Sequence, residues 1–189
     1  MIKQELTKDE IEFLSESNKI ERESGEIGSV AMDDAVKAWI YAKREFKKNK
    51  GKLSIPFILG IHKRLLQRLA LHYAGQIRTG AVMIGGEVRS QSKDEIIEEW
   101  GKLIEEWNNR IFLTGNSSQT EKREKQIKEY FVKTWHIGWE QVHGNFDGNG
   151  RTGRILMNLQ RLELELPLLI IHCGKEQSSY YQWFKGDKK

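Results

Sequence analysis

The positions of its glycines constrain the fold of this chain more than any other feature of the sequence. Eight of the 17 glycines fall in two short windows, residues 75–86 and 144–153. Glycine adopts backbone conformations that other residues avoid, and it lets another group approach the backbone closely. Elsewhere apolar residues recur at helical spacing, and the chain holds only two prolines. The sequence therefore predicts a mainly α-helical chain with two places where the backbone turns sharply or meets another group.

Helical signals cover most of the chain outside these windows. Thr7 with Glu10, and Ser92 with Glu95, form capping boxes that start helices. The first helix starts near Thr7, and further helices are predicted over 33–48, 56–72, 92–108, 119–142, 150–165 and 178–184. The segment 119–142 carries aromatic residues that we interpret as core: Tyr130, Phe131, Trp135 and Trp139. No linker or repeat interrupts the chain, so we expect one domain over residues 1–189.

Residues 77–89 (IRTGAVMIGGEVR) depart from the helical pattern. They are rich in β-branched residues, alternate in polarity and contain the pair Gly85 and Gly86. These features predict a β-hairpin, or extended flap, between two helices. A hairpin in a helical chain also offers an edge to which an extended peptide can add as a strand.

Composition excludes several classes of protein. The chain carries 31 basic and 27 acidic residues, a net charge of +4, which is too small for a protein that coats nucleic acid. Cys173 is the only cysteine, so neither an intramolecular disulfide nor a cysteine-rich zinc site can form. The charged N-terminus lacks the apolar core of a secretion signal, and no apolar run approaches the roughly 20 residues of a membrane helix. We therefore expect a cytoplasmic protein with neither nucleic-acid nor membrane partners.

The second glycine window lies within residues 143–154 (HGNFDGNGRTGR). Gly148, Gly150 and Gly153 match the spacing of the dinucleotide-binding fingerprint, but a helix rather than a strand precedes them. A phosphate P-loop is excluded as well, because its Gly-Lys-Ser/Thr ending is missing. The physics behind both motifs still applies, since a glycine-rich loop that runs into a helix presents free N–H groups to an anion.

The side chains of this loop supply the chemistry of phosphate transfer. Arg151 and Arg154 lie three residues apart, share one helix face and offer planar, permanently charged forks to phosphate oxygens. Asp147 is the one carboxylate of the loop, and one carboxylate together with substrate phosphates is a usual way to hold Mg²⁺. Asn149 can donate an amide hydrogen bond, and His143 can take a proton near neutral pH. The set predicts phosphoryl or nucleotidyl transfer.

The segment resembles the signature of the Fic family (filamentation induced by cyclic AMP), His-Pro-Phe-x-Asp/Glu-Gly-Asn-Gly-Arg-x-x-Arg. The chain keeps these positions of the signature: His143, Asp147, Gly148, Asn149, Gly150, Arg151 and Arg154. Gly144 stands in place of the proline, and Asn145 in place of the phenylalanine that anchors the loop in the family. We expect that either Phe146 takes over this anchoring or the loop is looser and less active.

The resemblance extends over nearly the whole chain. It implies a Fic-type helical bundle with a small β-hairpin flap (77–89) beside the active-site loop (143–154). Residues 74–86 are similar to the family's target-docking flap, with docking positions at Thr79, Gly80, Ala81, Val82, Met83, Ile84 and Gly85. Within the first helix (7–24), Ser17 and Glu21 fit the family's inhibitory motif Ser/Thr-x-x-x-Glu-Gly/Asn, although Arg22 stands where glycine or asparagine is usual.

The activity that this resemblance implies is protein adenylylation, the transfer of AMP from ATP–Mg²⁺ to a serine, threonine or tyrosine hydroxyl of a target protein. His143 would deprotonate the hydroxyl, and Asp147 would bind Mg²⁺. Self-modification and assembly into a homo-oligomer are compatible with this activity.

The resemblance also assigns the ATP phosphates and the inhibition. The phosphate-binding residues would be Gly148, Asn149 and Gly150 at the α-phosphate, with Arg151 and Arg154 at the β- and γ-phosphates. Glu21 would pair with Arg154 and displace the γ-phosphate from its productive place, because a carboxylate in that fork both removes a phosphate ligand and repels the triphosphate. The resting enzyme would therefore be weak.

Other functions stay open at this stage. Relatives with the same fold transfer phosphate, UMP or phosphocholine, and some remove AMP. Kinase-type relatives carry a lysine where this chain has Gly150, which favours AMP transfer. Removal of AMP stays open, because Glu21 could orient a water as easily as block ATP. A weakly active module that only binds ATP or a partner is a further alternative, supported by Gly144 and Asn145.

Overall fold

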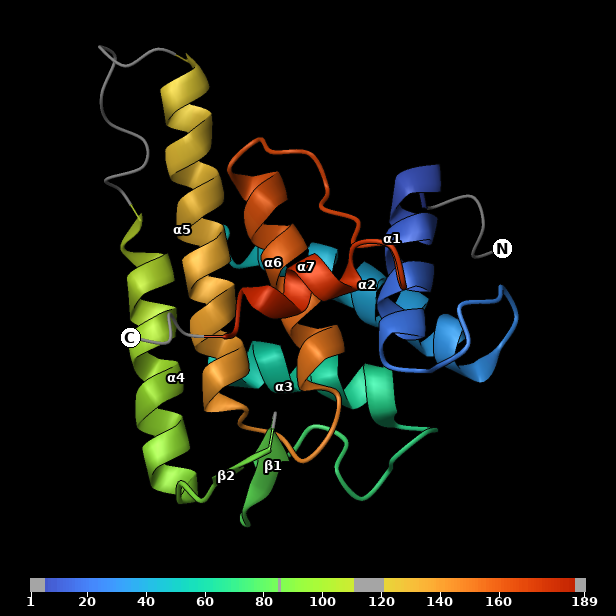
Figure 1. Cartoon of the computed structure of the whole chain (residues 1–189), viewed down its shortest axis with the longest axis vertical. Helices are drawn as coiled ribbons and strands as arrows, with labels where there is room; N and C mark the ends of the chain where they lie inside the picture. Colours follow the sequence, from blue (N-terminus) through green and yellow to red (C-terminus); the bar gives the residue numbers. More distant parts are fainter. Residues whose placement is uncertain (1–5, 85, 111–120, 186–189) are drawn as a thin grey trace.

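The computed structural model describes residues 6–84, 86–110 and 121–185. It is mainly α-helical with one small hairpin, which confirms the predicted fold class (Figure 1). The helices are α1 (Lys8–Ile20), α2 (Val30–Lys48), α3 (Ile55–Leu66), α4 (Lys93–Asn108), α5 (Glu121–Val142), α6 (Asn149–Glu163) and α7 (Gln177–Gln182). The strands are β1 (Val82–Ile84) and β2 (Glu87–Arg89). Within these ranges, no helix combines the length and apolar character that crossing a membrane requires.

Side-chain caps set several helix starts. Both predicted capping boxes are present, at Thr7 and Ser92, where the cap hydroxyl accepts a hydrogen bond from the backbone N–H three residues on. α2 starts at Val30, earlier than predicted, because Ser29 caps it through the N–H of Met32.

The end of α3 differs from the prediction. The helix stops at Leu66 instead of reaching residue 72, because the chain turns back on itself. The N–H groups of Leu69 and Ala70 both bind the carbonyl of Leu66. Gly75 ends these turns in the left-handed conformation (φ 72°), and its N–H then meets His62 on α3.

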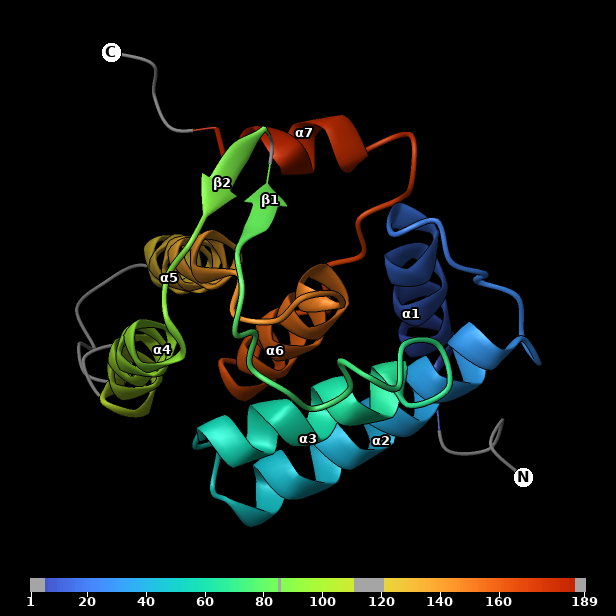
Figure 2. The same ribbon diagram turned by 90° about the horizontal axis from the view of Figure 1, so that it is seen from below.

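α6 forms the centre of the structure. Every residue from Arg151 to Arg161 is buried, so this helix packs against neighbours on all sides. Figure 2 shows α5, α3, α2 and α1 around it, with α7 on the remaining side. The N-terminal end of α6 carries the predicted phosphate-binding arginines, which are therefore interior residues.

Aromatic side chains fill the space beside α6. Trp100 of α4 stacks on Trp139 of α5 with ring centroids 4.8 Å apart, and Trp139 stacks on Trp135 at 6.2 Å. The aromatic residues of α5 are core as predicted, except Tyr130, which is 73% exposed on the outer face of the helix.

The predicted hairpin is confirmed, although only its outer part forms strands. β1 and β2 pair antiparallel, with Val82 opposite Arg89 and Met83 opposite Val88. Figure 1 shows the pair beyond the lower ends of α5 and α6. Met83 and Val88 are 74% and 64% exposed, so apolar side chains of the hairpin face solvent.

Candidate active site

The predicted site residues converge where the loop 143–148 joins α5 to α6. The hairpin lies on one side of this loop (Figure 1), and the C-terminal end of α1 reaches it from another through contacts of Glu21 and Glu23. Of the predicted residues, only Gly85 lies outside the described part of the chain.

His143 starts the loop in a left-handed backbone conformation, with a φ of 47°. Its carbonyl accepts a hydrogen bond from Arg78 Nε at 2.8 Å. Burial lowers the pKa of the His143 imidazole, and the nearby Arg78 charge lowers it further. The ring is therefore neutral near pH 7 and able to accept a proton.

Arg78 ties the loop to the hairpin, and the sequence prediction missed this role. Its side chain is fully buried and donates to the carbonyls of His143 and Gly80 at 2.8 and 2.9 Å. The Arg78 side chain also donates to the side-chain oxygen of Gln91 at 2.7 Å, and the backbone N–H of Arg78 donates to the carbonyl of Gly144. One side chain thus fixes the loop start and both ends of the hairpin. In the sequence this arginine was visible only as part of the segment that resembles the family's docking flap.

His62 of α3 holds the middle of the loop and was also missed. Its Nδ1 accepts the N–H of Gly75 at 2.9 Å, so the ring proton sits on Nε2 and is donated to the carbonyl of Asp147 at 2.8 Å. Burial lowers the pKa of His62, which keeps this neutral tautomer in place.

Asn145 anchors the loop. Its side chain is fully buried and donates to the carbonyl of Gln76 at 2.6 Å. Its backbone N–H and carbonyl bind the side-chain oxygen and nitrogen of Asn149 at 3.0 and 2.8 Å. The Asn149 amide, predicted to face the α-phosphate, therefore closes the loop in this structure.

The departures from the family signature fit their surroundings, and hydrogen bonds of Asn145 hold the loop; lower activity stays a prediction. A Cβ on Gly144 would lie 2.6 Å from Trp100 and 2.8 Å from Ile96, so only glycine fits here. Phe146 is not the anchor either. It is 37% exposed and packs against Tyr73 with ring centroids 5.1 Å apart.

The loop ends at an open helix N-terminus. Gly148 begins α6 in the left-handed conformation (φ 73°), and no side chain caps this end. Asp147 accepts the N–H of Gly148 at 2.6 Å, and its side chain is 54% exposed. Arg151 lies 3.7 Å from Asp147 and 3.9 Å from Glu23, with an exposed side-chain fraction of only 4%. Among described residues, no three His, Cys, Asp or Glu side chains cluster as a metal site.

Arg154 is buried beneath the end of α1. Its Nε donates to the Ser17 hydroxyl at 2.9 Å, and its Nη2 donates to the Ser17 carbonyl at 2.9 Å and to Glu21 Oε1 at 2.8 Å. The Glu21 carboxylate also lies against the position that a Cβ of Gly150 would occupy. Glu21 therefore fills the space between Arg154 and the start of α6.

The backbone at Arg22 accounts for the preference for glycine or asparagine at this position of the motif that the resemblance predicts to be inhibitory. Arg22 adopts a φ of 61°, a left-handed conformation that these two residue types reach most easily. The chain turns here immediately after Glu21 caps α1. An arginine can take this conformation at a modest cost, so the motif keeps its shape.

The flap positions lie along the edge of the hairpin. Thr79, Gly80 and Ala81 precede β1 directly and belong to neither strand, and the chain bends at Gly80. In the described two-stranded sheet, β1 pairs with β2 on one side only. Its other edge therefore has backbone groups available to an added strand.

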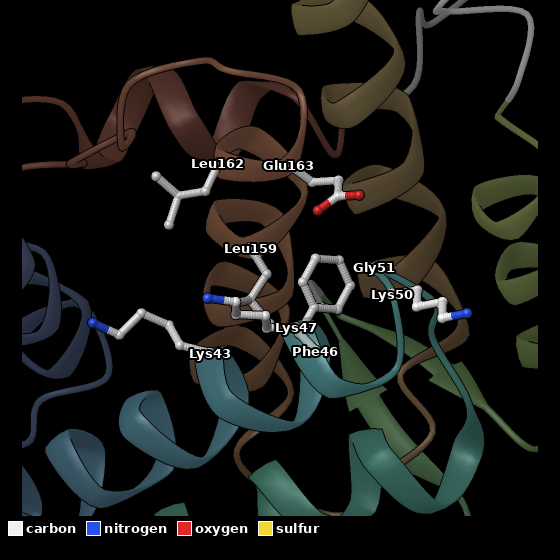
Figure 3. A pocket seen from close by; sticks show the side chains of 8 residues that line it. All are labelled: Lys43, Phe46, Lys47, Lys50, Gly51, Leu159, Leu162 and Glu163. Atoms are coloured by element: carbon white, nitrogen blue, oxygen red, sulfur yellow. The ribbon is translucent and has the colours of Figure 1, made fainter.

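A hollow of about 500 Å³ lies at the opposite end of α6 from the loop (Figure 3). It is lined by Lys43, Phe46, Lys47, Lys50, Gly51, Leu159, Leu162 and Glu163. None of the predicted site residues lines it. The hollow is thus separate from the loop site.

With this geometry described, comparisons with known proteins decide the family. Residues 52–160, more than half of the chain, match the Fic/DOC family. The chain belongs to this family. It is 30% identical over 136 residues to protein adenylyltransferase Fic of Drosophila willistoni and 28% identical over 134 residues to protein adenylyltransferase fic-1 of Caenorhabditis elegans. These alignments cover 72% and 71% of this chain but only 25% and 24% of the relatives.

Solved Fic structures share the fold. A Fic-domain signalling protein from Bacteroides thetaiotaomicron superposes with a TM-score of 0.70 at 21% identity, covering 93% of this chain and 70% of that one. The Fic-1 structure from C. elegans gives 0.68 at 22% identity, covering 96% and 56%. The Fic-type bundle predicted from the signature is therefore confirmed.

Proposed function

We propose that this chain is a protein adenylyltransferase held in check by the end of α1. In the proposed reaction, a serine, threonine or tyrosine hydroxyl of a target protein attacks the α-phosphorus of ATP. The bond from that phosphorus to the β-phosphate oxygen breaks, and pyrophosphate leaves. The observation that carries the proposal is the ion pair between buried Arg154 and half-buried Glu21, 2.8 Å apart, at a loop that also holds a neutral His143.

His143 is the proposed general base. Its imidazole is neutral near pH 7 and can take the hydroxyl proton as the oxygen attacks. Arg78 and His62 are positioning residues, because they fix the loop carbonyls of His143 and Asp147 rather than face the substrate. The flap edge at Thr79, Gly80, Ala81, Val82, Met83 and Ile84 would align the target segment by strand addition.

The residues present fit an ATP–Mg²⁺ complex. Asp147 offers an exposed carboxylate oxygen, the hard ligand that Mg²⁺ prefers, and the substrate phosphates supply the rest of such a site. Mg²⁺ would neutralise charge on the phosphates. The uncapped N-terminus of α6 at Gly148–Gly150 would meet the α-phosphate, and Arg151 and Arg154 the outer phosphates.

The inhibition follows from competition for Arg154. Ser17 and Glu21 already accept its hydrogen bonds, and the Glu21 carboxylate lies against Gly150 at the start of α6. A γ-phosphate cannot reach this guanidinium until the Glu21 carboxylate leaves. Hydrogen bonds to charged groups contribute about 1.5–3 kcal/mol. Loss of the contact between the γ-phosphate and Arg154 should therefore weaken nucleotide binding roughly 10- to 100-fold.

ATP labelled at the α-phosphate tests the proposal in a cell extract or with the purified chain alone. Glu21→Gly should raise protein labelling well above wild type, and adding His143→Ala should abolish it while nucleotide still binds. Glu23→Gly is the matched control, because Glu23 faces Arg151 only at 3.9 Å and should change labelling little. No label from Glu21→Gly refutes AMP transfer.

Labels on the γ-phosphate of ATP and on other nucleotides distinguish the other candidate reactions. Label from γ-ATP but not α-ATP indicates phosphate transfer, and label from UTP indicates UMP transfer. Release of AMP from a labelled protein by the wild-type chain, lost in Glu21→Gly, indicates AMP removal. Calorimetric ATP binding without turnover in Glu21→Gly indicates a nucleotide-binding regulatory module. Any of these results overturns the proposed forward reaction.

A further inference from the structure

Arg154 depends on α1 for its charge partner. The hydrogen bonds to the Ser17 hydroxyl, the Ser17 carbonyl and Glu21 all come from α1 and its cap. From elsewhere in the described chain it has a long bond to the Tyr180 hydroxyl, at 3.5 Å. With α1 in place Arg154 is 2% exposed, and withdrawal of Glu21 leaves its guanidinium without a carboxylate partner. A buried charge in that state is costly unless another group supplies the opposite charge.

Glu140 lies in the right place to supply it. It belongs to α5, one turn before His143, and its side chain is 12% exposed. Its Oε1 atom lies 2.6 Å from where a Cβ of Gly153 would be, so the absent side chain of Gly153 makes room for it against α6, and its charge interacts with that of Arg154. This atom has no hydrogen-bond partner within the described residues. A buried carboxyl oxygen without a hydrogen-bond partner is energetically costly. Glu140 also has no role in the proposed AMP transfer.

Four charged or titratable side chains face Glu140 from the elements packed around it: His136 of α5, Arg154 of α6, Glu21 at the end of α1 and Tyr180 of α7. His136 Nε2 lies 3.8 Å from Glu140 and 2.9 Å from the Tyr180 hydroxyl. Burial lowers the pKa of His136 to about 3 and raises that of Tyr180 above its usual range. Neither group changes charge near neutral pH, so Glu140 is the member of the cluster that can.

Glu140 is protonated while Glu21 occupies the site. Burial, with a smaller contribution from the Glu21 charge, raises the pKa of Glu140 to about 8, although the charge of Arg154 opposes this rise. Withdrawal of Glu21 removes one of the raising effects and leaves Arg154 unpaired. Both changes favour ionised Glu140.

We propose that Glu140 is the alternate counter-ion of Arg154, neutral while Glu21 or a nucleotide phosphate lies on this arginine and ionised when both are gone. The inference rests on the proposed function for the nucleotide, but the exchange between two carboxylates does not require AMP transfer. When a phosphate then binds Arg154, Glu140 loses its charge partner and becomes protonated. Nucleotide binding is therefore accompanied by the uptake of a proton. Nucleotide affinity falls as pH rises, by up to tenfold per pH unit between the two pKa values of Glu140.

Calorimetry of ADP with Mg²⁺ measures this proton directly. Glu21→Gly is titrated near pH 7 in two buffers of different ionisation enthalpy, beside Glu21→Gly/Glu140→Gln. The nucleotide's own titration is common to both, so the difference between them is the proton taken up by Glu140. We expect additional proton uptake by the single variant, and tighter binding with a flatter pH profile in the double variant. Equal uptake in both refutes the proposal.

Carbon-13 NMR of the glutamate carboxyls keeps the proposal testable without any nucleotide. The Glu140 signal should titrate near pH 8 in the wild-type chain and at least about one pH unit lower in Glu21→Gly. An unchanged titration overturns the inference even if AMP transfer is found. The expected shift in a chain that transfers nothing would support the counter-ion exchange while the proposed function fails.

Discussion

Gly144→Ala tests whether the departure from the family signature is a defect or a fit. The new Cβ would lie 2.6 Å from Trp100 Cε2 and 2.8 Å from the Ile96 Cγ2 atom, against ordinary contacts of about 3.5–4.0 Å. Trp100 cannot yield easily, because it stacks on Trp139. Overpacking of this kind costs about 1–3 kcal/mol, which for a chain of 189 residues lowers Tm by roughly 2–12 °C.

Movement of residue 144 caused by the added Cβ should also displace His143, the proposed general base. The Gly144 carbonyl accepts the N–H of Arg78, whose side chain holds the carbonyl of His143. In a Glu21→Gly background, Gly144→Ala should therefore lower the rate of AMP transfer more than it weakens nucleotide binding. The family residue, proline, brings the same Cβ and should lower the stability as well.

Thermal unfolding followed by circular dichroism provides the measurement, with Gly101→Ala as the control. Gly101 lies within α4, near Trp100, and a Cβ there meets open space. Alanine in an exposed helix should raise the stability by up to about 1 kcal/mol relative to glycine. A Gly144→Ala chain that melts at or above wild type, or shifts as Gly101→Ala does, refutes the steric argument.

Three further predictions concern the buried polar groups. Arg78→Lys should lower Tm and the rate of AMP transfer, because a single ammonium cannot serve the oxygens of His143, Gly80 and Gln91; melting curves and labelling rates check this. His62→Phe should cost about 2 kcal/mol by urea unfolding, since it removes two hydrogen bonds of about 1 kcal/mol each. Glu140→Gln should be increasingly more stable than wild type as pH rises from about 4.5 to about 8, by a few kcal/mol at most, because the folded state holds the Glu140 proton more tightly than the unfolded chain.

Local signals carried most of the fold prediction. Capping boxes at Thr7 and Ser92 set helix starts to within a residue, and the alternating segment before Gly86 formed the hairpin. The capping boxes and the alternating pattern both depend on residues that are close together in the sequence. α3 ended early because Gly75 turned back to reach His62, which no local pattern indicates.

The site residues that the sequence missed act over long sequence separations. His62 reaches Asp147 across 85 residues, and Arg78 reaches His143 across 65. The contacts that Gly144 and Asn145 make were not foreseen for the same reason. Their partners, Trp100 and the carbonyl of Gln76, come from other parts of the chain, so the signature alone could not show that they fit.

The most direct test of the account is the intact mass of the protein after incubation with ATP and Mg²⁺. The Glu21→Gly chain is compared, alone and with a cell extract, with the same variant carrying His143→Ala. The account predicts proteins heavier by one AMP group, each formed with loss of pyrophosphate, only where His143 is present. No AMP adduct on any protein, or an equal adduct without His143, would contradict it.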